Sequence, residues 1–367
     1  MSATTCWAIS RGSDEVSSGE LYVESRVEPR TSAPDGWDEY VARHPLATAY
    51  HNSAAVEIGR RAFGLRTLFL TACGRDGRIR GVLPLIEQSS AFFGRFLVSV
   101  PFFTYGGMLA DDARAASELA RRAAEHACER RADHLELRHA SAVPHLDLQE
   151  RLDKVSMVLP LPESIASLGE QLGSKLRSQV RRAEREELEI SWGGAERIPD
   201  FYQVFAPTMH QLGTPVYPRR FFDIAYEALH GVASVVVVRM RHEVQAAAIV
   251  VRHGRTLEVP WAAATPEAKR RSANMRMYWE MLRFAIDSGA EAFDFGRSTV
   301  DSGTYRFKAQ WGAQPRQLHW HYWLRSGGAI PKLNQSNPKY ARAAALWRRM
   351  PLWCANLIGP YIVRNLP

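Results

Sequence analysis

One order of predicted elements occurs twice along this chain. Between residues 67 and 137 the sequence predicts two strands joined by a tight turn, a third strand, an amphipathic helix over 111–131 and a closing strand. The same order returns between residues 234 and 295, with a helix over 272–288 and a closing strand over 292–295. Such a repeat indicates duplication of one α/β unit. A meander followed by a helical crossover predicts a mixed, mostly antiparallel sheet flanked by helices in each half.

The length of 367 residues suits two domains. We divide the chain into a polar N-terminal segment (1–35), a first domain (36–155), a second domain with the basic helix and closing segment (156–325) and an aromatic and basic C-terminal tail (326–367). Pro351 and Pro360 interrupt the tail, which favours packing over the second domain. Contact with a membrane surface is the alternative, because aromatic and basic residues together suit one.

Several functional classes are disfavoured by what the sequence lacks. No apolar run reaches a bilayer-spanning length and the N-terminus has no signal-peptide core, so we expect a cytoplasmic protein, free or peripheral at the inner face of the membrane. The net charge of +8 comes without nucleic-acid-binding motifs and indicates attraction for an anionic ligand. The four cysteines form no CxxC pair, and His319 and His321 lack a third ligand, so no metal is predicted. Hydrolase, kinase and dehydrogenase fingerprints are also absent.

The segment from Ala292 to Gly312 has the composition of a site. Apolar and polar residues alternate over 292–295, which predicts a strand that Gly296 ends, followed by a loop. Ligands of α/β folds bind at such strand ends. The predicted site residues in or beside the loop are Asp294, Arg297, Tyr305, Arg306 and Lys308.

A basic helix is predicted between the two repeats, over residues 168–187. Its apolar stripe consists of Leu168, Leu172, Leu176, Val180 and Ala183. The rest of its surface carries Lys175, Arg177, Arg181, Arg182 and Arg185. Two interpretations stay open: a solvated face partnered by nearby glutamates, or a face that binds an anion.

Three motifs in this order resemble the FemAB family within the GNAT acyltransferase superfamily, in particular its members associated with exopolysaccharide and exosortase gene sets. Residues 175–183 resemble the family's basic helix, and residues 212–217, which include Tyr217, resemble the loop after its next helix. Residues 293–297 with 307–308 and 311–312 resemble its closing segment. The resemblance implies tandem GNAT-like domains that transfer an acyl or aminoacyl group to an amine of a cell-envelope, peptidoglycan or exopolysaccharide precursor.

The family roles fall on particular residues of this sequence. Arg177 and Arg181, with Lys175 nearby, would contact a phosphate-bearing or glycan-linked acceptor, and Lys308 would serve the reacting centre. The donor implied is aminoacyl-tRNA, with acyl-CoA as the alternative. No long inserted coiled coil is present to hold a tRNA, and residues 270–275 lack the glycine usual in a pyrophosphate loop. Two other functions stay open: a CoA-dependent N-acetyltransferase of a small molecule, and a non-catalytic module that binds an anionic glycan or RNA.

Acyl transfer to an amine needs a base and a positive group beside the developing oxyanion. We expect Lys308 to supply that charge. Asp294 would either accept the amine proton or hold Arg297, and the second role is favoured because an aspartate beside an arginine is a weak base. Tyr305 either orients the acceptor or packs on the sheet. Trp261 either lines the substrate pocket or is buried, and burial is favoured.

Overall fold

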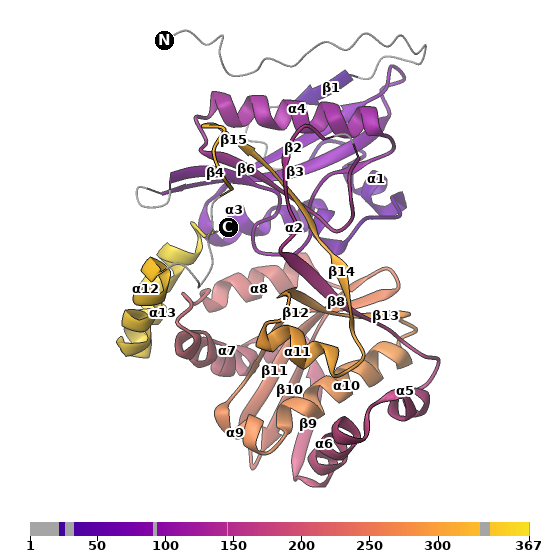
Figure 1. Cartoon of the computed structure of the whole chain (residues 1–367), viewed down its shortest axis with the longest axis vertical. Coiled ribbons are helices and arrows are strands. Elements are labelled where there is room, and N and C mark those ends of the chain that lie inside the picture. Colours follow the sequence, from indigo (N-terminus) through magenta and orange to yellow (C-terminus); the bar gives the residue numbers. More distant parts are fainter. Residues whose placement is uncertain (1–21, 26–32, 91–93, 145, 331–337, 367) are drawn as a thin grey trace.

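The protein contains two mixed β-sheets stacked along its long axis (Figure 1). This computed structural model describes residues 22–25, 33–90, 94–144, 146–330 and 338–366. The first sheet has the order β1 (Tyr22–Ser25), β2 (Arg66–Cys73), β3 (Ile79–Ser90), β4 (Gly94–Val98), β6 (His134–His139), β15 (His319–Leu324) and β7 (Gln149–Arg151), with β5 (Leu109–Ala110) beside β3. The second has the order β14 (Gln314–Gln317), β8 (Lys154–Pro160), β13 (Ala292–Thr299), β12 (Thr256–Ala264), β11 (Glu243–His253), β10 (Ala233–Met240) and β9 (Leu188–Gly193).

Helices form layers above, between and below the two sheets. The first half contributes α1 (Trp37–Arg43), α2 (Ser53–Val56), α3 (Ile58–Phe63) and α4 (Ala113–Glu129). The second contributes α5 (Ile165–Gln171), α6 (Ser174–Arg185), α7 (Ile198–Leu212), α8 (Arg219–Ala228), α9 (Pro266–Arg270), α10 (Ala273–Asp287) and α11 (Gly303–Ala309). The outer face of the first sheet packs on α4, and that of the second on α5, α6 and α10. One apolar core, with residues of α1–α3, α7, α8 and both sheets, fills the layer between them.

The predicted duplication is confirmed strand by strand. In each sheet three antiparallel strands are followed by a helical crossover to a parallel strand: β2, β3, β4 and β6 in the first, β10, β11, β12 and β13 in the second. The flanking strands correspond as well, with β1 matching β9 and β15 matching β8. Asp112 caps α4 through its carboxylate, which accepts from the backbone N–H of Ala115 (2.8 Å). The fold is therefore tandem GNAT-like.

The strand that follows each repeat along the chain lies in the other repeat's sheet, which the sequence did not predict. After the first repeat, β8 joins the second sheet, and after the second repeat, β15 joins the first. Residues 149–158 pair antiparallel with residues 314–322 along one ribbon that runs from sheet to sheet. In the division above, residues 319–324 belong to the second domain, but they form β15 in the first sheet. Because each half completes the other's sheet, the halves are held by backbone hydrogen bonds as well as by their shared core.

Three local expectations need correction. Gly296 does not end its strand: β13 continues to Thr299, with a bulge between Asp294 and Arg297. Tyr305, Arg306 and Lys308 lie on α11, where a loop was predicted, because Ser302 caps this helix through the N–H of Tyr305 (3.2 Å). The helix expected over 168–187 is two helices, α5 and α6, separated by the extended residues Leu172 and Gly173.

The C-terminal tail forms α12 (Pro338–Arg349) and α13 (Leu352–Val363). Both helices pack on α7 of the second half, as expected. The chain end also reaches the first sheet, where Gln88 Nε2 donates to the carbonyl of Arg364 (2.8 Å). Pro351 separates the two helices, whereas Pro360 lies within α13 without ending it. Residues 1–21 of the predicted polar segment lie outside the described residues.

Candidate functional site

The parallel strands β12 and β13 diverge at the middle of the second sheet. Their ladder runs from Thr256 opposite Ala292 to Glu258 opposite Asp294 and ends there. Along its other edge β13 pairs with β8 from Ala292 to Thr299, with a bulge between Asp294 and Arg297. Gly296 lies in this bulge with a φ of 76°, a left-handed conformation that glycine adopts without steric cost. The divergence opens a wedge at the carboxyl end of the pair, where α/β folds bind ligands.

Asp294 lies at the apex of this wedge and is saturated with hydrogen bonds. Its carboxylate accepts from Tyr105 Oη, from Ser156 Oγ (2.6 Å) and from the N–H of Gly296 (2.7 Å). Burial raises the pKa of Asp294, and the charge of Glu258 adds to the rise. The expected pairing with Arg297 is therefore wrong. Asp294 nevertheless has a structural role, with Tyr105, Ser156 and Gly296 as its partners. It holds the bulge of β13 and links it to the first half of the chain through Tyr105.

Glu258 is fully buried beside Asp294 and has one unpartnered oxygen. Its Oε2 accepts from Tyr50 Oη (2.8 Å) and contacts His253 Nε2 at 2.6 Å. The N–H of Ala49 donates to His253 Nδ1 (2.8 Å), so the proton of a neutral imidazole lies on Nε2 and is donated to Glu258. Glu258 Oε1 has no partner among the described residues. Because buried acceptors are normally hydrogen-bonded, we expect this oxygen to accept a hydrogen bond from a water or a ligand.

Lys308 fastens the bulge from the opposite side. Its Nζ donates to the carbonyl oxygens of Gly296 (2.8 Å) and Arg297 (2.9 Å), and the residue is 9% exposed. Burial lowers the pKa of Lys308 to about 8, although the charge of Asp294 opposes the fall. The ammonium thus lies beside the bulge, within electrostatic reach of Asp294 and Arg297 and away from bulk solvent. Two of its three N–H groups are used by the backbone.

Arg297 leaves the bulge toward the first half of the chain. Its guanidinium lies over the Trp320 ring at 4.9 Å, and that of Arg138 lies over the same ring at 4.6 Å. Arg138 is bound by Glu136 (2.7 Å) and by backbone carbonyls, whereas no ion pair or hydrogen bond is found for the guanidinium of Arg297 among the described residues. Arg297 is exposed to water, yet the surrounding protein desolvates it and, with the charge of Arg138, lowers its pKa to about 10. A guanidinium without a protein hydrogen bond suits an anionic ligand.

The two arginines occupy equivalent places in the repeats. Glu136 ends the parallel ladder of the first half opposite Val98, as Asp294 ends that of the second opposite Glu258. Arg138 follows Glu136 by two residues, and Arg297 follows Asp294 by three because the bulge adds one. Duplication thus places two guanidinium groups on one indole between the sheets.

The basic helix lies on the other face of the second sheet. Arg177 and Arg181 line a cavity of about 290 Å³ between α5, α6 and α10, with Trp279 at its wall. All five residues of the predicted apolar stripe are buried. Trp279 Nε1 is buried and has no partner among the described residues. The structure therefore does not bring the basic helix together with Asp294, whose side chain lies on the opposite face of the sheet with Tyr105 of the central core.

The other predicted site residues are scattered. Tyr217 stacks on Phe221 at 4.6 Å and lies near enough to Arg297 for that charge to oppose the rise that burial causes in its pKa. Trp261 is 8% exposed and packs in the central core, in agreement with burial. Tyr305 is half-buried against the outer core of the second sheet. Lys175 and Arg306 are exposed.

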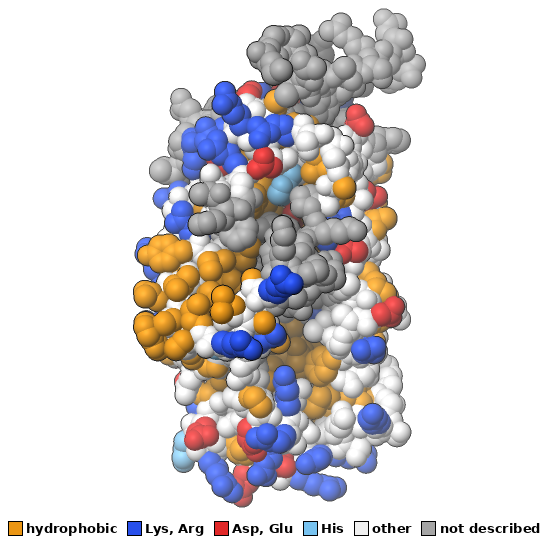
Figure 2. Space-filling view, turned by 60° about the vertical axis from the view of Figure 1, so that its left-hand side comes forward, with side chains coloured by type: hydrophobic (Ala, Val, Ile, Leu, Met, Phe, Trp, Pro, Cys, Tyr) orange, Lys and Arg blue, Asp and Glu red, His pale blue; other side chains and the backbone are white. Residues whose placement is uncertain are grey.

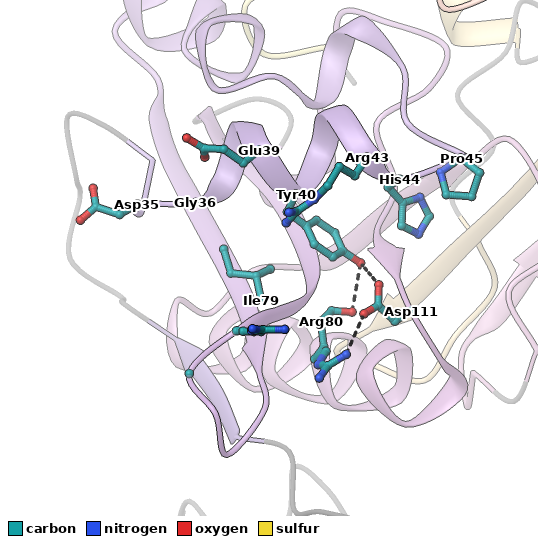
Figure 3. Close-up of a pocket in the computed structure, with 12 residues that line it drawn as sticks. Asp35, Gly36, Glu39, Tyr40, Arg43, His44, Pro45, Ile79, Arg80 and Asp111 are labelled. Carbon is teal, nitrogen blue, oxygen red and sulfur yellow. Dashed lines mark hydrogen bonds and ion pairs between the residues drawn. The ribbon is translucent and has the colours of Figure 1, made fainter.

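A larger open hollow of about 710 Å³ lies in the first half, against α1 (Figure 3). Three of its polar residues, Tyr40, Arg80 and Asp111, are bound to one another. Tyr40 Oη donates to Asp111 (2.9 Å) and to the carbonyl of Arg80 (3.0 Å), and Arg80 lies 3.8 Å from Asp111. Acidic and basic groups alternate around it, so the hollow favours no single charge.

Five residues of the central site were not predicted: Tyr50, Tyr105, Arg138, Glu258 and Trp320. Two carried a signal in the sequence. Glu258 is the one charged residue in an otherwise apolar strand, and Arg138 follows the Leu-Glu-Leu sequence that matches Phe293-Asp-Phe in the repeat. The tyrosines and Trp320 meet the site through tertiary contacts alone.

Comparison with known proteins agrees with the tandem arrangement of the two halves. Residues 173–309 match the acetyltransferase (GNAT) domain family. Among solved structures, FemX is 16% identical over 77% of this chain and 94% of its own, with a TM-score of 0.61. L-PGS from Bacillus licheniformis is 11% identical over 88% and 98% (TM-score 0.54), and a tandem GNAT protein from the clavulanic acid biosynthesis pathway is 12% identical over 85% and 100% (TM-score 0.52). No curated protein matches in sequence.

The second half of the chain thus matches the GNAT domain family over residues 173–309, and the chain as a whole has the fold of tandem GNAT proteins. FemX has the same arrangement of both halves, which agrees with the FemAB resemblance of the sequence motifs. At these identities the structural likeness establishes the fold, while donor and acceptor must be argued from the site.

Proposed function

We propose that this protein transfers an acyl or aminoacyl group to an amine of a cell-envelope precursor, of the peptidoglycan or exopolysaccharide kind. The observation that carries the proposal is the wedge between β12 and β13, with Glu258 at its apex and Arg297 at its side. Past Glu258, β12 keeps its neighbour β11 and has no strand along its other edge among the described residues. An extended amide-bearing donor can pair with such an edge.

Acyl-CoA fits the wedge as donor. Ser272, at the start of α10, has a φ of 60° and gives no side-chain cap, and no acceptor is found among the described residues for the N–H groups of Ala273 and Asn274. Free amides at a helix N-terminus bind phosphate groups. Because nearby Arg270 and Arg271 are paired with Glu267, these backbone amides are the main hydrogen-bond donors available to a pyrophosphate. Aminoacyl-tRNA, the donor implied by the FemAB resemblance, is the competing choice.

The acceptor is proposed to lie on the first-half side of the wedge. The guanidinium of Arg297 has no ion pair or hydrogen bond among the described residues, and Arg138, Trp320 and Tyr217 complete a positive, aromatic wall beside it. A carboxylate or phosphate of the precursor would bind Arg297. Arg177 and Arg181 would bind a second anionic group on the far side of the sheet, within reach only of a long acceptor or of the donor.

The reaction joins the amine nitrogen to the acyl carbon and breaks the bond from that carbon to the donor's leaving atom. We assign removal of the amine proton to Glu258 Oε1 through a water, because this oxygen is the unpartnered acceptor at the apex. Lys308 is assigned a positioning role, since its ammonium holds the carbonyls of Gly296 and Arg297. By holding the bulge it sets where the guanidinium of Arg297 meets the substrate.

Mass spectrometry of ligands retained by freshly purified protein identifies the donor, and thermal shifts with acetyl-CoA and with aminoacyl-tRNA compare the two candidates. Transfer is then followed as the mass gained by amine-bearing peptidoglycan and exopolysaccharide precursors and by small amines. We expect the acyl mass to appear on a precursor, and Glu258→Gln to abolish most of it while donor binding persists. Donor binding with no transfer to any amine would refute the proposal and indicate a binding module. Transfer to small amines alone would indicate an N-acetyltransferase.

A further inference from the structure

An apolar stripe is exposed along the C-terminal helices. Trp353, Leu357 and Tyr361 follow one another at intervals of four residues on α13, so they share one face. Their exposed fractions are 69%, 64% and 69%. Two further exposed residues, Ile358 of α13 and Leu346 of α12, widen the stripe. Figure 2 shows a broad field of hydrophobic side chains at the height of α12 and α13, with basic side chains at its margin. We name these five residues the tail patch.

The opposite face of α13 is already used for packing. Ala355, Gly359 and Val363 are buried, and a Cβ on Gly359 would lie 2.8 Å from the carbonyl oxygen of Val216. The helix is therefore held against the protein by one apolar face while the other apolar face meets water. Exposed large apolar side chains are costly in water and, when contiguous, mark an interaction surface.

The charge around the tail patch has one sign. From Ser302 to the C-terminus the sequence has ten Lys and Arg and no Asp or Glu. On α12, Arg342, Arg348 and Arg349 are all exposed. An apolar stripe with Trp and Tyr, bordered by arginines, complements a surface that is apolar inside and anionic outside.

We propose that the tail patch docks this protein onto an anionic lipid bilayer, with α13 lying in the plane of the interface. At 12 residues, α13 is too short to cross the hydrocarbon core, which takes about 20 residues, and no helix among the described residues is long and apolar enough to do so. Insertion would bury Trp353, Leu357 and Tyr361 at the boundary between headgroups and acyl chains. Arg348 and Arg349 would meet lipid phosphates.

A bilayer fits this surface better than a second copy of the chain. A two-fold interface through the tail patch would place the arginines of both copies close together with no acidic residue of the tail to neutralise them. RNA would satisfy the arginines and could stack on Trp353 and Tyr361, but it offers no apolar partner to Leu346, Leu357 and Ile358. Docking is independent of the proposed acyl transfer, because the tail patch contains no residue of the wedge.

The test is co-sedimentation of the full chain with vesicles of equal parts phosphatidylglycerol and phosphatidylcholine. We expect binding that weakens with added salt and with vesicles of phosphatidylcholine alone. In the triple variant Trp353→Ser, Leu357→Ser, Tyr361→Ser, the partition coefficient for vesicles should fall by about tenfold or more, while the thermal unfolding temperature stays unchanged. Leu46→Ser with Leu152→Ser, at exposed apolar positions outside the tail patch, is the matched control and should bind as the wild type does.

The charge component has its own pair of variants. Arg348→Glu with Arg349→Glu should abolish the preference for anionic vesicles, whereas Arg241→Glu with Lys269→Glu, at exposed positions elsewhere, should keep it. Failure of the wild type to bind vesicles, or equal binding by the triple variant, would overturn the proposal. Sedimentation velocity and RNA binding are measured on the same proteins. A dimer or an RNA complex that the triple variant loses, without vesicle binding, would assign the tail patch to that partner instead.

Discussion

Replacing Lys308 by methionine separates its positioning role from its contribution to stability. Methionine keeps a similar length and fills the same space, but it cannot donate to the carbonyls of Gly296 and Arg297. The bulge of β13 then loses its support on the α11 side, and Arg297 loses its defined position over Trp320. Asp294 still holds the other side through the N–H of Gly296.

Two opposing energies decide how much stability changes. Two hydrogen bonds from a charged donor together contribute about 3 kcal/mol or somewhat more. Against this, the fall of the Lys308 pKa from 10.5 to about 8 means that burying the ammonium costs about 3 kcal/mol. The free energy of unfolding should therefore change by less than about 2 kcal/mol. Turnover should fall about a hundredfold or more, equivalent to about 3 kcal/mol, because the guanidinium of Arg297 is displaced and no longer holds the acceptor in the reactive position.

The assay compares kcat and urea unfolding of Lys308→Met with those of Lys269→Met, an exposed control on α9. Lys308→Arg should rescue poorly, since a planar guanidinium cannot reach both carbonyls as a compact ammonium does. Between pH 8 and 10.5 the wild type should gain stability relative to Lys308→Met, because there the unfolded chain binds a proton that the folded chain does not. Near-normal turnover in both Lys308 variants would refute the reasoning.

Three further outcomes are expected. Gly296→Ala should lower the free energy of unfolding by about 1 kcal/mol, because a φ of 76° strains any residue with a Cβ. Steric overlap adds nothing, since no atom lies closer than 3.5 Å to the added Cβ. An unchanged urea midpoint would show that the bulge relaxes. Arg177→Ala with Arg181→Ala should raise KM for a phosphate-bearing substrate with little loss of thermal stability, whereas lost stability at unchanged KM would leave the helix a solvated face. Burial lowers the pKa of His51 to about 4 and of His139 to about 3, so both stay neutral in the folded chain while the unfolded chain protonates below its ordinary 6.5. Stability should accordingly fall as pH drops from 6.5 toward 4, less steeply in His51→Gln, and equal urea midpoints at pH 7 and pH 5 would contradict this.

Much of the fold follows from local sequence patterns. Alternation, turn residues and helical periodicity predicted the meanders, α4 and α10, and the repeat of this order predicted two similar sheets. Each signal depends on residues a few positions apart, which is why it survives in a single sequence. The same holds for the apolar stripe of α6, all of which is buried.

The candidate site was predicted in part. The sequence located Asp294, Arg297 and Lys308 near one another, because all three lie within fifteen residues. It gave Asp294 the wrong partner, because Tyr105 and Ser156 lie far away along the chain and compete for the same carboxylate. It also grouped the basic helix with these residues, although a β-sheet separates it from the carboxylate of Asp294.

The sequence by itself determined the repeated α/β unit, the basic helix and a strand end rich in charged residues, since each is encoded by neighbours along the chain. Only the tertiary structure decided how the halves join. Residues 149–158 and 314–322 pair across more than 150 intervening positions, and no local pattern specifies a partner at that separation. This pairing brings Trp320 between Arg138 and Arg297. The site therefore depends on contacts between segments whose own sequences show only that they are strands.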